Sequence, residues 1–562
     1  MTSFSLNRDI FDLSKKSLVE IFYELNGKTD KQFIKEKNHV RFLQDYLGKK
    51  GLDARYAVLE RDYINKDYLI DYSTYYSTCF ETYSKTGFRL HFFSIDIKIE
   101  SFKTRFFNFI ISKDKQSQRH RDFVDKHYLG YIVVKPIPNL FIGFSLLKHY
   151  NYSESKACFD KARHFWGVKN YKKHIFGTEV EIPSLAFQEQ DQNVAACATI
   201  AIWSMLQIAA EDYYVVLQSP SEITRNGGIV AYNGNRLLPN TGLSILQMSQ
   251  AITQNSLVTE VRERTDYKGD ASFNLYIKKL IHAYANLRIP TILIINLSPP
   301  VFDKEKLGKS EVEDESEFDG HAVAVTGYKM RPLREIKRRN RLLKRTSQSF
   351  ESESIVWMAD LIEKIYVHDD QWGPFARMIF SGKERIRSSW QLIAGYNKIS
   401  RTEGLLIPVY PKVRIAYDDI ESKIIRLNNI FVDHLKEEIK GDFVWDIQIH
   451  YSEQFKASIR ESKKLDDKNK DDQKLMFKFL AKSLPKYIWV ATLQVEEQKI
   501  LYFVYDATGL SGSNLILSIF GYYPKFTSLF KEILKRHQNI RSTKFTYIFD
   551  YNIKAYIDAI VD

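Results

Sequence analysis

The sequence predicts an α+β fold, with a central domain and one further α+β domain on each side of it. Its 562 residues exceed what one hydrophobic core usually holds, so two to four domains are expected. An apolar content of 44% with 27% charged residues is typical of globular chains and excludes an intrinsically disordered one. Helical and strand-like patterns alternate along the whole chain, and we expect domains over residues 1–150, 151–403 and 404–562.

The N-terminal segment mixes both kinds of pattern. Apolar residues recur at helical spacing in 17–25 and 38–47. Residues 88–97 and 128–138 are rich in β-branched and aromatic residues, which favours strands, and prolines end the second one. The segment contains no recognisable catalytic cluster, so its role is left open.

The central segment predicts a buried helix followed by several strands. Residues 197–210 are almost wholly apolar and contain neither Gly nor Pro, which is typical of a helix buried on most sides. Further helices are expected in 153–166, 243–254 and 272–287, and strands in 291–297, 320–328 and 364–370.

The C-terminal segment begins at a predicted domain boundary. Prolines in 404–415 predict a short strand pair there. An amphipathic helix is expected over 418–439, and 487–495 with 499–508 should form an antiparallel pair. Both flanking domains could recognise substrate, hold a regulatory protein partner or mediate oligomerisation.

Cysteine usage and hydropathy limit the class of protein. Three cysteines in so long a chain (Cys79, Cys158 and Cys197) argue against a disulfide framework and favour a reducing compartment. No Cys/His spacing of the zinc type is present, and we expect neither a metal nor a cofactor. The sequence shows no secretory signal and no apolar run of the roughly 18 residues that a membrane span needs. We therefore expect a cytoplasmic protein without a membrane partner.

The net charge of +13 raises the possibility of nucleic-acid binding. Residues 329–345 alone contribute +8, within a charged insertion at 329–354. Such a patch could contact phosphates. We favour a solvated amphipathic helix that packs through Leu333, Ile336 and Leu343, because the stacking aromatics of single-strand binders do not interleave its charges.

Cys197 and His321 are the candidate catalytic residues. Cys197 heads the apolar helix in EQDQNVAACATIAIW (189–203), where small alanines would let a substrate backbone approach the sulfur. Amide cleavage by cysteine needs a thiolate, which a helix N-terminus and a neighbouring imidazolium both favour. His321 follows Gly320 at the mouth of an apolar strand, GHAVAVTGY (320–328). The alternative for each residue is a buried structural role.

The order of these strings, followed by VHDDQWGPF (367–375), resembles the papain-like cysteine peptidases over roughly residues 181–380. The resemblance implies that an acid before Trp-Gly orients the histidine and that Trp372 shields the pair from water. By the papain pattern the acid is Asp370, two positions before Trp-Gly, and this is the preferred assignment. By the pattern of the bacteriocin-processing relatives it is Asp369.

The resemblance also implies a glutamine upstream of the cysteine as an oxyanion donor. Gln188, Gln190 and Gln192 all qualify by position, and Gln190 and Gln192 bracket the papain spacing. Gln190 is preferred. Gln192, Trp372 and Gly320 are expected to line the substrate cleft.

Together these features predict a papain-like cysteine peptidase that hydrolyses a peptide or amide bond through a Cys–His–Asp triad and a thioester. Its partner would be a protein or peptide substrate. Deamidation and transglutaminase-type acyl transfer use the same attack and stay open. So do a catalytically degenerate papain-like binding module and, with less support, a nucleic-acid-binding protein.

Overall fold

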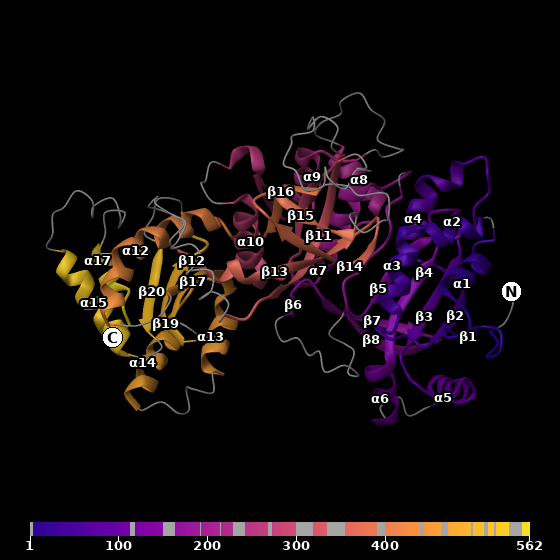
Figure 1. Ribbon diagram of the computed structural model, residues 1–562, viewed down its shortest axis with the longest axis horizontal. Helices are drawn as coiled ribbons and strands as arrows, with labels where there is room; N and C mark the ends of the chain where they lie inside the picture. Colours follow the sequence, from indigo (N-terminus) through magenta and orange to yellow (C-terminus); the bar gives the residue numbers. More distant parts are fainter. Residues whose placement is uncertain are drawn as a thin grey trace.

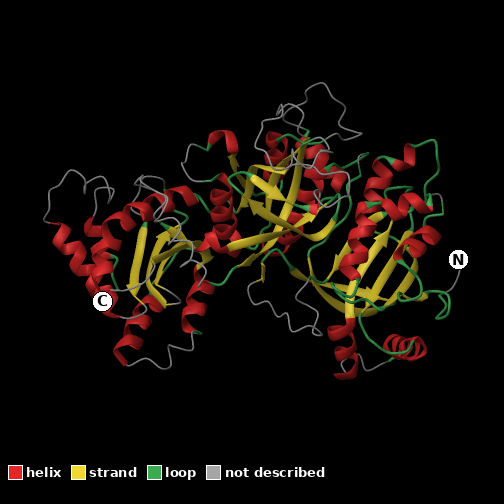
Figure 2. Ribbon diagram, viewed as in Figure 1, coloured by secondary structure: helices red, strands yellow, loops and turns green. Residues whose placement is uncertain are grey.

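In its described residues the computed structural model contains four β-sheets, of five, eight, five and two strands, with helices packed around them (Figures 1 and 2). It describes residues 4–561 except 28, 113–117, 150–162, 192, 214, 229–241, 268–271, 299–318, 334–354, 390–399, 439–442, 462–469, 496–497, 511–514, 522–523 and 539–552. Helix and strand contents of 38% and 35% make the fold a mixed α and β one, consistent with the expected α+β class.

The N-terminal unit, residues 4–149, is built on a sheet of five antiparallel strands in the order β1-β2-β3-β4-β5. The strands are β1 (Ile10–Asp12), β2 (Tyr56–Tyr63), β3 (Gly87–Phe93), β4 (Tyr128–Val134) and β5 (Ile142–Leu147). The helices are α1 (Leu18–Leu25), α2 (Lys31–Glu36), α3 (Asn38–Leu47), α4 (Lys66–Thr74), α5 (Ile99–Ile111) and α6 (Gln118–His127).

Both faces of this sheet are buried, because successive strand residues point to opposite sides. Leu59 and Phe92 pack with α1, α2 and α3 in one core cluster. Val58 and Phe93 face the other way and pack with the phenylalanines of α5. The helix α3 therefore lies between the sheet and the rest of the molecule, where it contacts β14.

The central unit, residues 163–333 and 358–409, holds a sheet that closes on itself. Its strands are β6 (Arg163–Phe165), β9 (Val258–Glu263), β10 (Thr291–Leu297), β11 (Asp319–Met330), β13 (Ile362–Asp369), β14 (Gly373–Ser381), β15 (Arg385–Arg387) and β16 (Ser400–Val409). Pairing runs β10-β11-β13-β14-β15-β16, and β16 pairs back to β10, so the six strands form a ring. A separate hairpin joins β7 (Lys169–Ile175) to β8 (Thr178–Ser184).

The described α-helices of the central unit are α7 (Cys197–Tyr213), α8 (Pro220–Gly227), α9 (Ile245–Thr253) and α10 (Phe273–Tyr284). The described part of α7 is buried around most of its circumference, as its apolar sequence predicts. It packs against β11, β10 and β13. The first residue of α7 is thereby brought to the start of β11.

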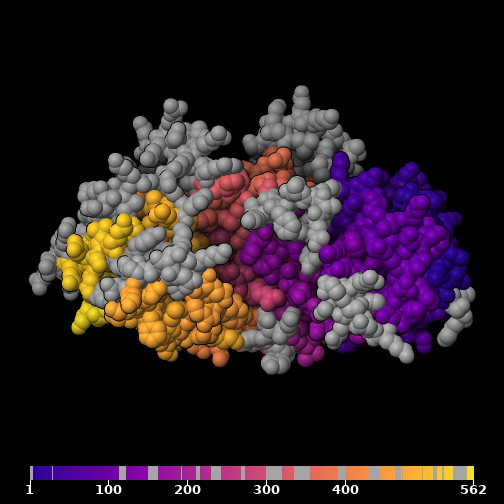
Figure 3. Space-filling model, turned by 90° about the horizontal axis from the view of Figure 1, so that it is seen from below, coloured from indigo at the N-terminus to yellow at the C-terminus, as the bar shows by residue number. Residues whose placement is uncertain are grey.

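The C-terminal unit, residues 355–357 and 410–561, contains the sheet β12-β17-β18-β19-β20. Its strands are β12 (Val356–Trp357), β17 (Phe443–Tyr451), β18 (Tyr487–Val495), β19 (Gln498–Asp506) and β20 (Ile516–Gly521). Its helices are α12 (Tyr417–Glu438), α13 (Ser452–Arg460), α14 (Lys470–Ala481), α15 (Pro524–Gln538) and α17 (Ile553–Asp558). Figure 3 shows the three units side by side in chain order along the long axis.

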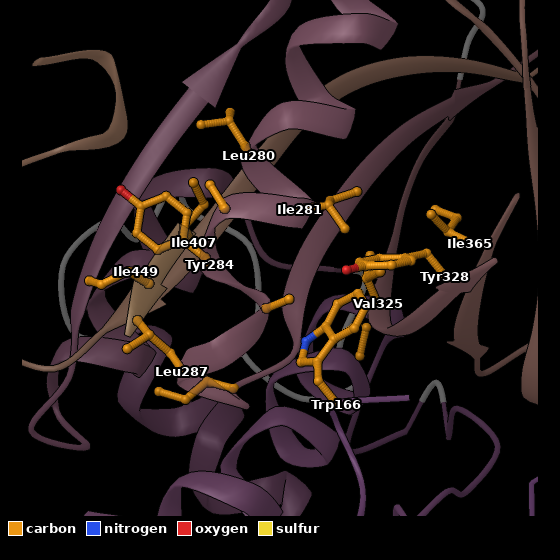
Figure 4. Packing of buried hydrophobic residues seen from close by; sticks show 14 of the residues in the cluster. Trp166, Leu280, Ile281, Tyr284, Leu287, Val325, Tyr328, Ile365, Ile407 and Ile449 are labelled. Carbon is orange, nitrogen blue, oxygen red and sulfur yellow. The ribbon is translucent and has the colours of Figure 1, made fainter. Parts of the chain in front are cut away.

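One hydrophobic core runs through all three units, from Ile10 to Ile560. In the central unit Trp166 stacks obliquely on Tyr328, with ring centroids 5.1 Å apart (Figure 4). Towards the C-terminal unit Tyr284 meets Trp489 edge-on at 5.2 Å. The units therefore share buried apolar surface.

Two local predictions are wrong. Residues 163–165, at the end of the expected helix 153–166, form strand β6, because they pair with the far end of β11; residues 153–162 lie outside the described part. Residues 404–415 do not form a strand pair: 400–409 are the single strand β16, which pairs with β9 and β10. The expected boundary at 403/404 consequently falls inside a strand of the central sheet.

The structure bears on the prediction that no segment of the chain spans a membrane. Among the described residues, no helix combines the length and the apolar character needed to cross a bilayer.

Candidate active site

Cys197 is the first residue of α7 and is half-buried. The chain before it is held in a tight loop, in which Asp191 and Ala195 exchange both backbone hydrogen bonds, at 2.9 and 2.6 Å. Thr224 of α8 fixes the same loop, because its hydroxyl donates to the carbonyl of Val194 at 2.9 Å. The thiol is therefore presented from a rigid helix start, where the first-turn N–H groups have no acceptor within the helix.

His321 lies near the start of β11, opposite Ile295 of β10, and only 2% of its surface is exposed. Because α7 packs on β11, the side chains of Cys197 and His321 come together and form a hydrogen bond. Two residues that are far apart in the chain thus meet, as the sequence predicts for a nucleophile and its base.

The last residue of β13, Asp369, completes the group. Its Oδ1 lies 3.0 Å from Nε2 of His321 and also accepts the backbone N–H of Gln371 at 3.1 Å. Since Nε2 is engaged by this carboxylate, Nδ1 is the ring nitrogen left to exchange a proton with the thiol.

The charge of His321 is favoured by its neighbours. Burial by itself lowers the pKa of the imidazole, but the Asp369 carboxylate and the hydrogen bond with Cys197 raise it, and the net result is a pKa well above the usual value. The surroundings thus stabilise an imidazolium beside the sulfur, which is the state that a thiolate needs as its partner.

Asp370 has a different environment from its neighbour. It is 2% exposed, and among the described residues neither carboxylate oxygen has a hydrogen-bond partner; the nearer one lies 3.8 Å from Nε2 of His321, too far for a hydrogen bond. Burial raises the pKa of this carboxyl to about 7, with Asp369 adding to the effect and His321 opposing it.

The structure thus differs from the preferred assignment of the orienting acid. Asp369, not Asp370, makes the hydrogen bond to His321. Asp369 is the last residue of β13 and pairs with Gly373 of β14, whereas Asp370 is the first residue after the strand.

The upstream glutamines occupy different places. Gln190 is half-buried, and its backbone N–H donates to the carbonyl of Asp370 at 3.3 Å. Gln188 is buried and lines a small polar pocket with Asp71 and Lys135, beneath the loop that leads to Cys197. Gln192 lies outside the described residues. The loop therefore brings Gln190 to the turn that carries the acids.

The two remaining expected cleft residues flank the group. Trp372 is buried, and its backbone N–H donates to the carbonyl of Asp369 at 3.0 Å, which closes the turn after β13. Gly320 is exposed, and a Cβ added there would meet only Asn296 Oδ1, at 4.0 Å. The surface beside His321 is thus uncrowded by side chains of the described residues.

Two further residues at this site were not expected from the sequence. The side-chain amide of Gln371 lies 3.4 Å from Nδ1 of His321. Its position in the sequence, between Asp370 and Trp372, could have indicated that it lies at this site. His39 of α3 contacts the carbonyl of Asp370 at 2.6 Å from 331 positions upstream, and nothing local in the sequence indicates this.

The same residues could also hold a cation. His321, Asp369 and Asp370 each offer a ligand atom, and these atoms lie within 4.8 Å of one another. They form the one such group among the residues that the structure describes. Imidazole and carboxylate are ligands that suit Zn²⁺. Against the prediction of no metal, this cluster is therefore the place to test for one.

Several predicted features fall outside the described residues. They are most of the basic insertion, from residue 334 to 354, and Cys158.

Comparison with models of known protein families finds no match for this chain, and comparison with curated proteins finds none either.

Proposed function

We propose that the protein is a cysteine peptidase of papain-like type that cleaves a peptide or amide bond with Cys197, His321 and Asp369. The observation that carries the proposal is the chain of hydrogen bonds from the thiol through the His321 ring to the carboxylate. A half-buried nucleophile, a base and an orienting group in that order meet the geometric requirement for covalent catalysis by a thiol.

In this mechanism His321 takes the thiol proton at Nδ1, and the Cys197 sulfur forms a bond to the substrate carbonyl carbon. The carbon–nitrogen bond then breaks, and the imidazolium gives its proton to the leaving amine. An acyl thioester stays on Cys197. A water molecule that loses its proton to His321 attacks this thioester, releases the acid and restores the thiol.

The carbonyl oxygen becomes negatively charged during both steps and needs hydrogen-bond donors. The backbone N–H of Cys197 is one, because it lies in the first turn of α7. Gln190 is the proposed side-chain donor, as the sequence indicates. Gln371 is a second candidate, because its amide lies beside Nδ1 of His321.

The expected substrate is a protein or peptide in the cytoplasm. Acyl transfer and deamidation begin with the same thioester, so the product distinguishes them from hydrolysis. In H₂¹⁸O, hydrolysis of a peptide places one ¹⁸O in the new carboxyl group. Acyl transfer to an added amine gives an amide without the label.

Alkylation of the three cysteines tests the nucleophile directly. The full chain is treated with limiting iodoacetamide at pH 7 and mapped by mass spectrometry. Cys197 is expected to react at least about 100-fold faster than Cys79, another free and partly buried cysteine, since activation by a positioned base is worth at least that factor. Equal rates at the two residues would refute the proposal.

Two paired variants and a chelator complete the test. Asp369→Asn is expected to slow alkylation of Cys197 by about 10- to 100-fold, as loss of the orienting charge weakens the imidazolium. Asp370→Asn is the matched control and should change the rate less. EDTA is expected to have no effect. A rate that falls on chelation and returns with Zn²⁺ would assign the His–Asp–Asp cluster to a metal instead.

A further inference from the structure

We propose that His39, in the N-terminal unit, is a positioning residue of this site that fixes the turn carrying Asp369. The inference rests on the proposed function for its catalytic consequence, and on the contacts of α3 for its geometry. It assigns the N-terminal unit, for which the sequence gives no role, a part in forming the site.

His39 is 6% exposed and aims one nitrogen at the site. Its Nε2 lies 2.6 Å from the backbone oxygen of Asp370. A carbonyl can only accept, so Nε2 must carry the proton. Its Nδ1 lies 3.7 Å from Glu189 Oε2, too far for a hydrogen bond. Among the described residues, the hydrogen bond of the ring therefore goes to the turn after β13.

The carbonyl of Asp370 is a junction of three chain segments. It accepts from His39 of α3 and also, at 3.3 Å, from the backbone N–H of Gln190 in the loop leading to Cys197. Its residue, Asp370, directly follows Asp369 in the chain. One oxygen thus ties the nucleophile loop and the acid turn to the N-terminal unit.

Neighbouring contacts hold His39 in register. Lys37 forms a buried ion pair with Glu189 at 2.6 Å, and the other Glu189 oxygen accepts the backbone N–H of Ile142 at 2.6 Å. One turn after His39, Phe42 lies so close to Gly373 that a Cβ there would come within 2.2 Å of its ring. The glycine that follows Trp372 is therefore required by α3.

Through these contacts His39 affects the distance between Asp369 and His321. The hydrogen bond that Nε2 of His321 donates to Asp369 depends on the position of the turn after β13, which is also held by the Trp372 N–H on the Asp369 carbonyl. A displacement of about 1 Å at a reacting group can cost about 100-fold in rate. Loss of the His39 donor should therefore slow the chemistry without altering any group that touches substrate.

Three substitutions at this position separate positioning from folding. Gln can place its Nε2 where the ring nitrogen lies, whereas Asn reaches only the position of Nδ1. In the full chain, His39→Ala and His39→Asn are expected to slow alkylation of Cys197 by about 10- to 100-fold. His39→Gln should recover most of the rate. On a peptide substrate, kcat should fall while KM stays nearly constant.

The matched control is His91→Gln. His91 is also a buried histidine of the N-terminal unit, but its nitrogens contact Tyr128 at 2.8 Å and Glu60 at 3.1 Å, away from the site. This variant should lower the melting temperature and leave the alkylation rate unchanged. If His39→Ala does not fold, the comparison of His39→Gln with His39→Asn still decides.

A second readout does not depend on catalysis. With ¹⁵N-labelled histidine, the imidazole signals of His321 report its contact with Asp369 whether or not Cys197 is reactive. They should shift in His39→Asn and return in His39→Gln. Unchanged signals together with a wild-type alkylation rate in His39→Asn would overturn the proposal. A shifted signal with an unreactive Cys197 would instead refute the proposed function and keep the positioning role.

Discussion

Two histidine–aspartate pairs lie at opposite ends of β11 and differ in the third residue that each histidine meets. At the start of the strand, His321 contacts Asp369 through Nε2 at 3.0 Å, and Cys197 at the head of α7. Towards its end, Tyr328 lies 2.9 Å from Nδ1 of His282, whose Nε2 lies 2.7 Å from Asp446. Both arrangements have the order of a nucleophile, base and acid relay.

The third residue decides what each relay can do. Cys197 is half-buried and is the first residue of α7, next to His321. Tyr328 is 3% exposed, and burial, with Asp446 adding to it, raises the pKa of its hydroxyl far above the usual value. The first relay is therefore fit for nucleophilic attack. The second joins the central and C-terminal units as a hydrogen-bonded bridge.

The carboxylates of the two regions also differ, because the pKa of one is lowered and the pKa of the other is raised. The pKa of Asp446 is lowered: burial raises it, but His282 outweighs burial by charge and hydrogen bond. At the other end, a second acid, Asp370, has its pKa raised to about 7. In the structural relay the single acid, Asp446, is paired with its histidine. The candidate active site has two acids, and only Asp369 makes a hydrogen bond with His321.

Removing each histidine should produce the largest difference between the two ends. His321→Ala is expected to slow alkylation of Cys197 by about 100- to 10,000-fold, the usual contribution of a positioned base. His282→Ala should leave that rate within about 3-fold and instead lower the free energy of unfolding by about 1–3 kcal/mol, because Asp446 loses its partner. Mass mapping and urea unfolding measure the two effects. Equal losses of rate in both variants would show that the comparison is wrong.

The opposite pKa shifts of the two acids should appear as opposite pH dependences of stability. Asp370 has a folded-state pKa of about 7, above its unfolded value, so its ionisation destabilises the fold increasingly as the pH rises from about 4 to 7. Asp446 has a lowered pKa, so its stabilisation is present above the unfolded pKa and is lost as the pH falls through the folded one.

Matched asparagine variants measure this contrast. Asp370→Asn should raise the free energy of unfolding at pH 8, by on the order of 2–4 kcal/mol, and change it little at pH 4. Asp446→Asn should lower it at pH 8, by about 1–3 kcal/mol, and less in acid. Urea titrations at both pH values give the four numbers. A destabilised Asp370→Asn at pH 8 would mean that this carboxylate has a partner after all.

Much of the fold followed from local patterns in the sequence. Helix 38–47 and strand 291–297 were predicted to the residue. The helix has apolar residues at helical spacing, and the strand is an apolar run that begins after Pro290 and ends before Pro299. The 404–415 segment failed because prolines suggested a break, whereas Pro408 lies within β16 opposite Thr259 of β9.

The residues of the candidate site also fall into two groups, those that local sequence patterns predict and those that they do not. Cys197 and His321 could be assigned because each stands at the end of a strongly patterned element. The choice between Asp369 and Asp370 could not, since the two acids are adjacent in sequence and the outcome depends on where β13 ends relative to His321. His39 could not be found either, because its contact joins segments 331 positions apart.

The smallest effect is expected from the hydroxyl of Tyr328. Tyr328→Phe removes the partner of His282 Nδ1 and leaves the apolar packing against Trp166 in place. We expect it to lower the free energy of unfolding by about 1 kcal/mol, the usual value of one buried hydrogen bond. A double-mutant cycle with His282→Ala isolates that bond.

The rate of Cys197 alkylation should not change in Tyr328→Phe, because seven positions along β11 separate Tyr328 from His321 and no hydrogen bond among the described residues connects the two relays. A change above about 10-fold in that rate, worth about 1.4 kcal/mol, would show that β11 transmits strain between its ends, and that the two relays work as one unit.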